Sequence, residues 1–279
     1  MKKKKGTSVL AIAGGVLALT GTMLVPISAY AANVVDEPTL KAAIAAGEDV
    51  TLTGNITLTS PLVIPATYAG KIDGGGFTVT ANLDISFTGM SRNGMFFVQG
   101  KPTFTNITVD GEHKWRGFWV EPQGELNLDP QTHVTNGRGN ITFGDGGAIL
   151  LAENSKLNLN GAKISNSEGV LVSKNNGIGD GGGVMARAGS VVTGTDCTFE
   201  NNKTSASEDS NGGGIFIMRG KLTLDRCTFT GNSAVRVIDK GNQGAGIYAT
   251  LSFVKVTNST FNVGKHFNTG GGIRTHLGT

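Results

Sequence analysis

The sequence has few charged residues, few aromatic residues and only two cysteines. Charged side chains make up 16% and aromatic side chains 6% of the 279 residues. So few aromatic residues argue against a large globular core and favour a narrow core built by stacking. Glycine is abundant, with 43 residues, but it lacks the three-residue period of collagen. The composition therefore favours turns and exposed strand faces over helices.

Positive charge is concentrated at the N-terminus. The run Lys2–Lys5 precedes an apolar stretch, Val9–Val25, and the small-x-small cleavage pattern Ala29-Tyr30-Ala31. We therefore predict a signal peptide over residues 1–31 and a secreted or cell-surface protein. An uncleaved anchor is the alternative, because the apolar stretch approaches membrane-spanning length.

Removal of this leader changes the charge argument. The formal net charge of +3 includes the four leader lysines, so the mature chain carries +3 − 4, about −1. This value argues against nucleic acid and anionic membranes as partners. We expect no membrane span after cleavage, and no cysteine at the junction supports lipid attachment.

The stretch 212–232, GGGIFIMRGKLTLDRCTFTGN, contains three short apolar segments. Each alternates apolar and other residues, which is the period of a strand with one buried face. The pattern recurs along the chain in three registers. The first contains Met95, Phe118, Ile149, Val184, Ile215, Ile247 and Ile273; the second contains the pairs Leu126/Leu128, Leu157/Leu159, Val192/Gly194, Leu222/Leu224 and Val254/Val256; the third contains Val109, Val134, Ile164, Phe199, Phe229 and Phe261. Successive members of the first register lie 23 to 35 residues apart. Repeats of this length built from strand-sized pieces predict a solenoid.

The chain after the leader is expected to form one domain, residues 32–279. Residues 36–47 predict a short helix, with Asp36 as its cap, Pro38 in its first turn and Gly47 at its end. This helix is placed to cover the first open coil. The chain stops six residues after Ile273, so we expect the domain to be truncated or uncapped there, continuing into further coils or meeting a partner.

Several motifs resemble those of known bacterial surface proteins. The opening DEPTLKAAIAAGEDVTLTGNITLTSPLVIP and the later IDGGGFTV look like the pectate-lyase-like adhesive domains of Gram-positive surface proteins. The segments GGGI at residues 212–215 and FTGN at residues 229–232 resemble repeats of polymorphic outer-membrane proteins. Together these resemblances cover residues 36–279 and imply an all-β, right-handed parallel β-helix with an N-terminal capping helix. They say less about the ligand, because fold does not fix function.

The two cysteines occupy the same register, so Cys197 and Cys227 are expected on adjacent coils. Distance and an oxidising compartment allow a disulfide. Stacked side chains point in parallel, however, and the sequence favours two free, buried thiols.

Asp145 and Asp180 both precede a glycine run and are weak candidates for sharing Ca²⁺. The turn-forming tendency of Asp-Gly explains both residues without a metal, and we expect neither metal nor cofactor.

The only concentrated aromatic and basic cluster contains His113, Trp115, Arg116 and Trp119. By register Phe118 faces inward, so Trp119 is expected to face outward, where it could stack on a sugar or grip a protein. Covering of a corner between two coils is the alternative role. Longer inserts at residues 170–180, 204–211 and 234–243 predict loops and further contact regions.

The sequence predicts an adhesion or recognition module that presents a rigid face to a glycan or a host or cell-surface protein. The alternative is a polysaccharide lyase or hydrolase on the same scaffold. A lyase needs clustered acidic Ca²⁺ ligands with a basic residue, and a hydrolase needs paired acids. The acidic residues here are scattered singly among turns, and Gly74-Gly75-Gly76 lacks the G-K-[ST] of a phosphate loop. We therefore expect no catalytic residues.

Overall fold

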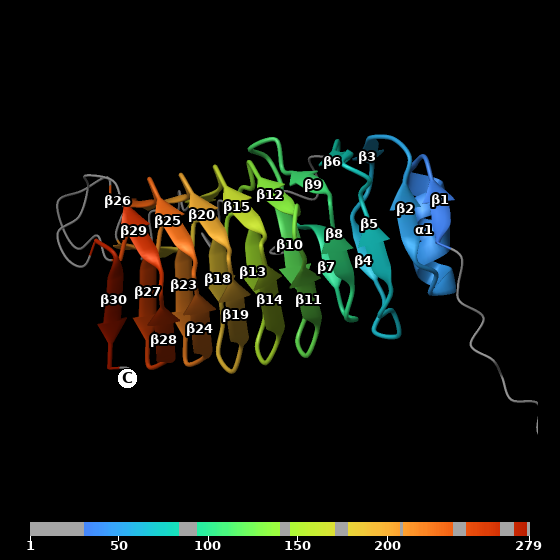
Figure 1. The fold of residues 1–279 in the computed structure, drawn as a ribbon. Helices are drawn as coiled ribbons and strands as arrows, with labels where there is room; N and C mark the ends of the chain where they lie inside the picture. Colours follow the sequence, from blue (N-terminus) through green and yellow to red (C-terminus); the bar gives the residue numbers. More distant parts are fainter. Residues whose placement is uncertain are drawn as a thin grey trace, which may run out of the picture.

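The computed structural model describes residues 31–83, 94–139, 146–170, 178–206, 209–236, 244–262 and 271–277. Three long parallel sheets run side by side along one axis, and successive coils of the chain pass through each sheet in turn (Figure 1). This architecture is a parallel β-helix, as the repeat predicts.

Each of the three sheets takes one strand from every complete coil. Sheet A has nine strands: β1 (Ala32–Val34), β2 (Val50–Leu52), β5 (Lys71–Asp73), β8 (Thr103–Thr105), β11 (Glu125–Leu128), β14 (Lys156–Asn160), β19 (Val191–Thr195), β24 (Lys221–Asp225) and β28 (Phe253–Thr257). Sheet B has eight: β3 (Ile56–Leu58), β6 (Thr78–Ala81), β9 (Thr108–Asp110), β12 (His133–Thr135), β15 (Lys163–Ser165), β20 (Thr198–Glu200), β25 (Thr228–Thr230) and β29 (Thr260–Asn262). Sheet C also has eight: β4 (Leu62–Ile64), β7 (Gly94–Val98), β10 (Arg116–Val120), β13 (Ile149–Leu151), β18 (Val184–Ala186), β23 (Ile215–Met218), β27 (Ile247–Thr250) and β30 (Ile273–His276).

The predicted inward columns are confirmed by the strand pairing. In sheet C, Phe118 pairs with Ile149 and the column continues through the later coils to Ile273. In sheet B, Phe199, Phe229 and Phe261 stack with 4.7 Å between successive ring centroids. Full burial of each such side chain contributes about 1.5–3 kcal/mol, so the stacked interior is the main source of stability.

One assignment in this register is wrong. Phe118 pairs with Phe96 rather than with Met95, and the two rings stack with their centroids 5.2 Å apart. Met95 and Phe96 are both buried, so the apolar pattern of the sequence does not distinguish them. The pairing of neighbouring strands decides between the two.

The helix α1 (Glu37–Ala46) covers the first coil as predicted. The Asp36 carboxylate accepts a hydrogen bond of 2.9 Å from the backbone N–H of Thr39, and Gly47 ends the helix with φ of 76°. The apolar side chains Leu40 and Ile44 are buried, and the helix contacts β1 to β4. Its buried face therefore closes the N-terminal end of the solenoid core.

Asparagine has two distinct roles at the corner between sheets B and C. Asn201 adopts a left-handed conformation with φ of 52°, which its side chain tolerates. The next residue, Asn202, is fully buried, and its amide donates to the Ile164 carbonyl at 2.9 Å and to Asn232 Oδ1 at 3.1 Å. This ladder satisfies buried backbone groups from coil to coil.

The longer inserts are more ordered than the predicted loops. Parts of them form two additional parallel sheets: β16 (Glu168–Val170), β21 (Lys203–Ala206) and β26 (Ser233–Arg236) pair in one, and β17 (Ile178–Asp180) and β22 (Asp209–Asn211) pair in the other. These inserts extend the stacking of the coils, because inserts in neighbouring coils pair with each other. The remaining insert residues lie outside the described ranges.

Candidate functional site: the outer face of sheet A

The predicted aromatic and basic cluster does not form an exposed platform. Trp115 is 4% exposed and packs in the main core, Arg116 is 1% exposed, and Trp119 is 7% exposed. Of the four residues, only His113 is exposed. The prediction of a ligand-binding cluster is therefore wrong for the two tryptophans and the arginine.

The reason lies in a second apolar cluster outside the coil. Trp119 does point away from the interior, as predicted, but it packs with Leu150, Met185 and Phe216 in successive coils. The corner at Gly146, just before β13, lies against this outer cluster, since a Cβ added at Gly146 would be 3.1 Å from Met185 Cβ. Strand alternation indicates which way a side chain points, but it does not indicate what covers that side.

Arg116 is held inside this part of the structure. Its Nε donates to the Gly146 carbonyl at 2.7 Å, and its guanidinium lies 5.3 Å from the centre of the Trp119 ring. A second arginine, Arg187, lies 6.0 Å from the same ring. Arg116 and Trp119 therefore pack at the corner between coils, which is the alternative role considered for them.

The candidate calcium pair is described in part. Asp145 lies outside the described residues. Asp180 is buried, and its Oδ1 accepts a 3.0 Å hydrogen bond from the Asn211 amide in the next coil. Across the described part of the chain, no three His, Cys, Asp or Glu residues are grouped so that they could hold a metal ion.

The structure joins Cys197 and Cys227 in a disulfide, so the preference for two free thiols is wrong. The stacked register brings their Cα atoms to 4.6 Å, within the range that a disulfide spans. Gly194 leaves room for the bond, since a Cβ there would be 2.9 Å from Cys197 Sγ. This glycine is also the weakest copy in its apolar register, and the disulfide explains why.

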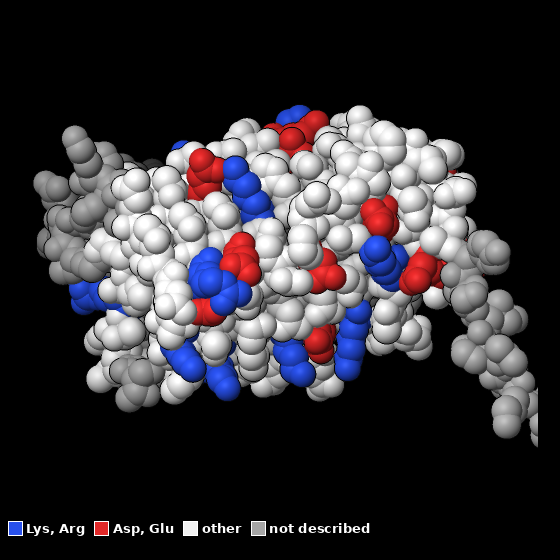
Figure 2. Space-filling model, viewed as in Figure 1, with Lys and Arg blue, Asp and Glu red and all other residues white. Residues whose placement is uncertain are grey.

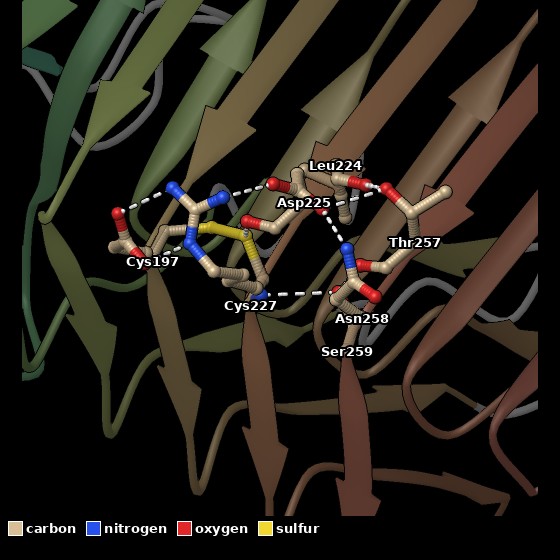
Figure 3. A network of polar contacts seen from close by, with 9 residues as sticks. Cys197, Leu224, Asp225, Cys227, Thr257, Asn258 and Ser259 are labelled. Carbon is tan, nitrogen blue, oxygen red and sulfur yellow. Dashed lines mark hydrogen bonds and ion pairs between the residues drawn. A yellow bond between two sulfur atoms is a disulfide. The ribbon is translucent and has the colours of Figure 1, made fainter.

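Next to the disulfide, charged and polar side chains form a network where the strands of sheet A end and the following turns begin (Figure 3). The Arg226 guanidinium donates to both carboxylate oxygens of Asp196, at 2.8 and 2.9 Å, and also contacts Asp225. Asp225 Oδ1 accepts hydrogen bonds of 2.8 Å from Thr257 and from Asn258. The network spans three consecutive coils.

These contacts keep the network ionised. The hydrogen bond from Arg226 lowers the pKa of Asp196, and hydrogen bonds from Thr257 and Asn258 lower the pKa of Asp225. The Asp196 and Asp225 carboxylates raise the pKa of Arg226. Because the Arg226 guanidinium already contacts two carboxylates, it links neighbouring coils and is not available to bind an anion.

The middle of sheet A's outer face is a row of hydrogen-bonded polar side chains. The Asn158 amide donates to Asn127 Oδ1 at 2.8 Å, and the Thr193 hydroxyl donates to Asn158 Oδ1 at 2.7 Å. These three residues pair across β11, β14 and β19. These hydrogen bonds link the outward side chains of neighbouring strands.

Two residues earlier in the same register lies a second outward row, which we call the lysine column. It contains Lys101, Glu125, Lys156, Val191, Lys221 and Phe253. A search for clusters of neighbouring residues in the sequence does not detect this column, because its members are single residues from separate coils. Reading one strand position before the inward leucines of the second register, such as Leu126 and Leu157, would have found it.

A polar cluster on sheet B was also missed. His133 Nε2 lies 2.7 Å from Ser165 Oγ, which in turn lies 3.0 Å from Thr135 Oγ1. Burial first, and then the nearby Lys163, lower the pKa of His133, which favours its neutral form. Ser165 is only 1% exposed, so its hydroxyl is a buried hydrogen-bonding group with little access for a ligand.

Comparison with protein families agrees with this architecture. The family model described as "Right handed beta helix region" matches residues 94–261, which is more than half of the chain. The chain therefore belongs to the right-handed β-helix family. Comparisons with curated proteins and with solved structures gave no match. In the described part of the chain, no helix has the length and apolar character needed to cross a membrane.

Proposed function

We propose that this chain is a secreted or cell-surface recognition module that binds its ligand on the outer face of sheet A. The observation that carries the proposal is the continuity of that face: nine parallel strands present aligned rows of polar and charged side chains. Each row repeats at the strand spacing of about 4.8 Å. A rigid surface of this kind suits an extended ligand that lies along the solenoid axis.

Export is part of the proposal. The predicted leader, residues 1–31, lies almost wholly outside the described residues, and β1 begins at Ala32, the expected first mature residue. A disulfide also suits an oxidising compartment. Mass spectrometry of the exported protein should find Ala32 at its N-terminus, and an intact leader on the exported product would contradict the proposed boundary.

Recognition is tested by binding of the mature protein to a panel of immobilised neutral and acidic polysaccharides and purified cell-surface proteins. The variant Thr223→Leu places a larger apolar group in the polar row of sheet A, and Thr228→Leu makes the same change on sheet B. We expect only Thr223→Leu to weaken binding. Equal binding by both variants would count against sheet A, and no binding to any ligand class would refute recognition.

The proposal assigns binding without bond cleavage. Incubation of the mature protein with pectins and other acidic glycans in the presence of Ca²⁺ tests this point directly. We expect the polysaccharide chain length to stay constant. Release of unsaturated products, or of shorter saturated fragments, would instead support the lyase or the hydrolase alternative.

A further inference from the structure

We propose that the lysine column binds a linear acidic polysaccharide that carries one carboxylate on every second sugar. This inference rests on the proposed recognition function and specifies its ligand. Lys156 in β14 and Lys221 in β24 lie on alternate strands of sheet A, and Lys101 continues the same spacing two residues before β8 begins. There the Glu125 N–H donates to the Gly100 carbonyl, which sets Lys101 opposite Glu125. At about 4.8 Å per strand, neighbouring lysines are about 10 Å apart and the outer two are about 19 Å apart.

The three ammonium groups are accessible. Lys101 and Lys221 are exposed, and neither has an ion pair with any described residue. The Lys156 side chain is 55% exposed, and its Nζ lies 3.8 Å from a carboxylate oxygen of Glu125. By contrast, Lys203 is ion-paired with Glu168 at 3.1 Å on another part of the surface.

The positions between the lysines favour an uncharged sugar. Glu125 lies between Lys101 and Lys156, and the Asn158 amide holds its carboxylate at 3.0 Å. A ligand carboxylate at that coil would meet this negative charge, which selects against a chain charged on every sugar. Val191 occupies the equivalent position between Lys156 and Lys221 and offers an apolar contact.

The column ends in an exposed aromatic residue. Phe253 is 49% exposed and follows Lys221 in the register, with Lys221 Nζ 5.8 Å from the ring centre. An aromatic face beside a cation suits the apolar face of a sugar ring whose neighbour carries a carboxylate. The pattern of the column is thus positive, negative, positive, apolar, positive, aromatic.

The length of a sugar matches this spacing. In an extended β-linked polysaccharide each sugar advances by about one strand spacing, so alternate sugars align with alternate coils.

Figure 2 shows Lys and Arg side chains gathered along the lower edge of the molecule, where the sheet A strands begin. This concentration contrasts with the net charge of about −1 for the mature chain, +3 − 4.

The test uses the mature protein and three probes: hyaluronan, with a carboxylate on every second sugar; polygalacturonate, with one on every sugar; and dextran, which is neutral. The variant Lys101→Gln/Lys156→Gln/Lys221→Gln should bind hyaluronan about 3- to 100-fold more weakly than wild type, the range expected for three exposed charge pairs. The matched control Lys114→Gln/Lys163→Gln/Lys203→Gln removes the same charge from paired lysines elsewhere and should bind normally.

A charge-permuted variant separates spacing from net charge. Lys156→Val/Val191→Lys moves one lysine by one coil and leaves composition unchanged. We expect weaker hyaluronan binding, whereas Glu125→Gln should increase binding to polygalacturonate. Circular dichroism and thermal melting of every variant confirm that the fold is retained.

The possible results distinguish this inference from the proposed function. Hyaluronan binding that both triple variants lose equally would overturn the lysine column and leave recognition intact. So would binding confined to dextran, or hyaluronan binding that the permuted variant retains in full. Binding to none of the three polysaccharides overturns the inference, and the wider panel of glycans and proteins then decides whether recognition also fails.

Discussion

Truncation of Phe229 to alanine should destabilise the β-helix strongly and locally. Phe229 is fully buried in β25, stacks on Phe199 and Phe261 at 4.7 Å, and fills the space against Gly214. Loss of a buried phenylalanine costs about 3–5 kcal/mol. Two stacked aromatic pairs are lost as well, so we expect a value near the top of that range, about 5 kcal/mol.

The effect should be confined to neighbouring coils, because each coil of a solenoid contacts only the next. Hydrogen exchange measured by mass spectrometry should show lost protection in β20, β25 and β29, while β2 to β6 stay protected. Urea unfolding of wild type and variant gives the change in the free energy of unfolding. The exposed neighbour Thr228→Ala is the control and should change stability by less than about 0.5 kcal/mol. A loss below about 1 kcal/mol for Phe229→Ala, or equal loss of protection in all coils, would refute this reasoning.

Three further predictions concern other parts of the structure. Removal of the disulfide by Cys197→Ala/Cys227→Ala should lower the free energy of unfolding by about 3–4 kcal/mol, because the bond closes a loop with a sequence separation of 30. A thiol assay on the denatured, unreduced wild type should find no free thiol, and two free thiols would contradict the bond. Gly182→Ala should destabilise by about 1–3 kcal/mol or more, since its Cβ would lie 2.4 Å from two backbone carbonyl oxygens, whereas Gly54→Ala meets nothing within 4 Å and should be neutral in thermal melting. Burial raises the pKa of Glu37, but hydrogen bonds from Lys41, Thr59 and Ser60 outweigh it and lower the pKa to about 2 from 4.5. The unfolded chain therefore binds the proton more tightly, so the stabilising contribution of Glu37 is complete above about pH 4.5 and is lost as the pH falls towards 2. Glu37→Gln should flatten the dependence of the melting temperature on pH between about 4.5 and 2.

The β-helix and its first cap were determined by the sequence. Strand alternation is a property of a few adjacent residues, and its recurrence aligned the columns from Phe118 to Ile273 and the phenylalanine stack ending at Phe261. The helix that begins after Asp36 and ends before Gly47 was also predicted, because capping depends on local hydrogen bonds. Local chemistry is visible in the sequence.

The tertiary structure alone decided what covers each surface. Trp119 faces outward as its position requires, yet it is buried because it packs in an outer cluster with apolar side chains of later coils. Trp115 and Arg116 are also buried by segments that are distant in sequence. Phe96 rather than Met95 enters the inner column because strand pairing sets the register. Burial outside a coil depends on where distant segments pass, and no local periodicity encodes that path.

The same reason explains the cysteines and the lysine column. Shared register placed Cys197 and Cys227 on adjacent coils, but the room for their bond comes from Gly194. The lysine column consists of single residues from separate coils, and it becomes a surface only when parallel pairing aligns them. The sequence determined the repeat, and the stacking of its copies decided which side chains meet and which remain exposed.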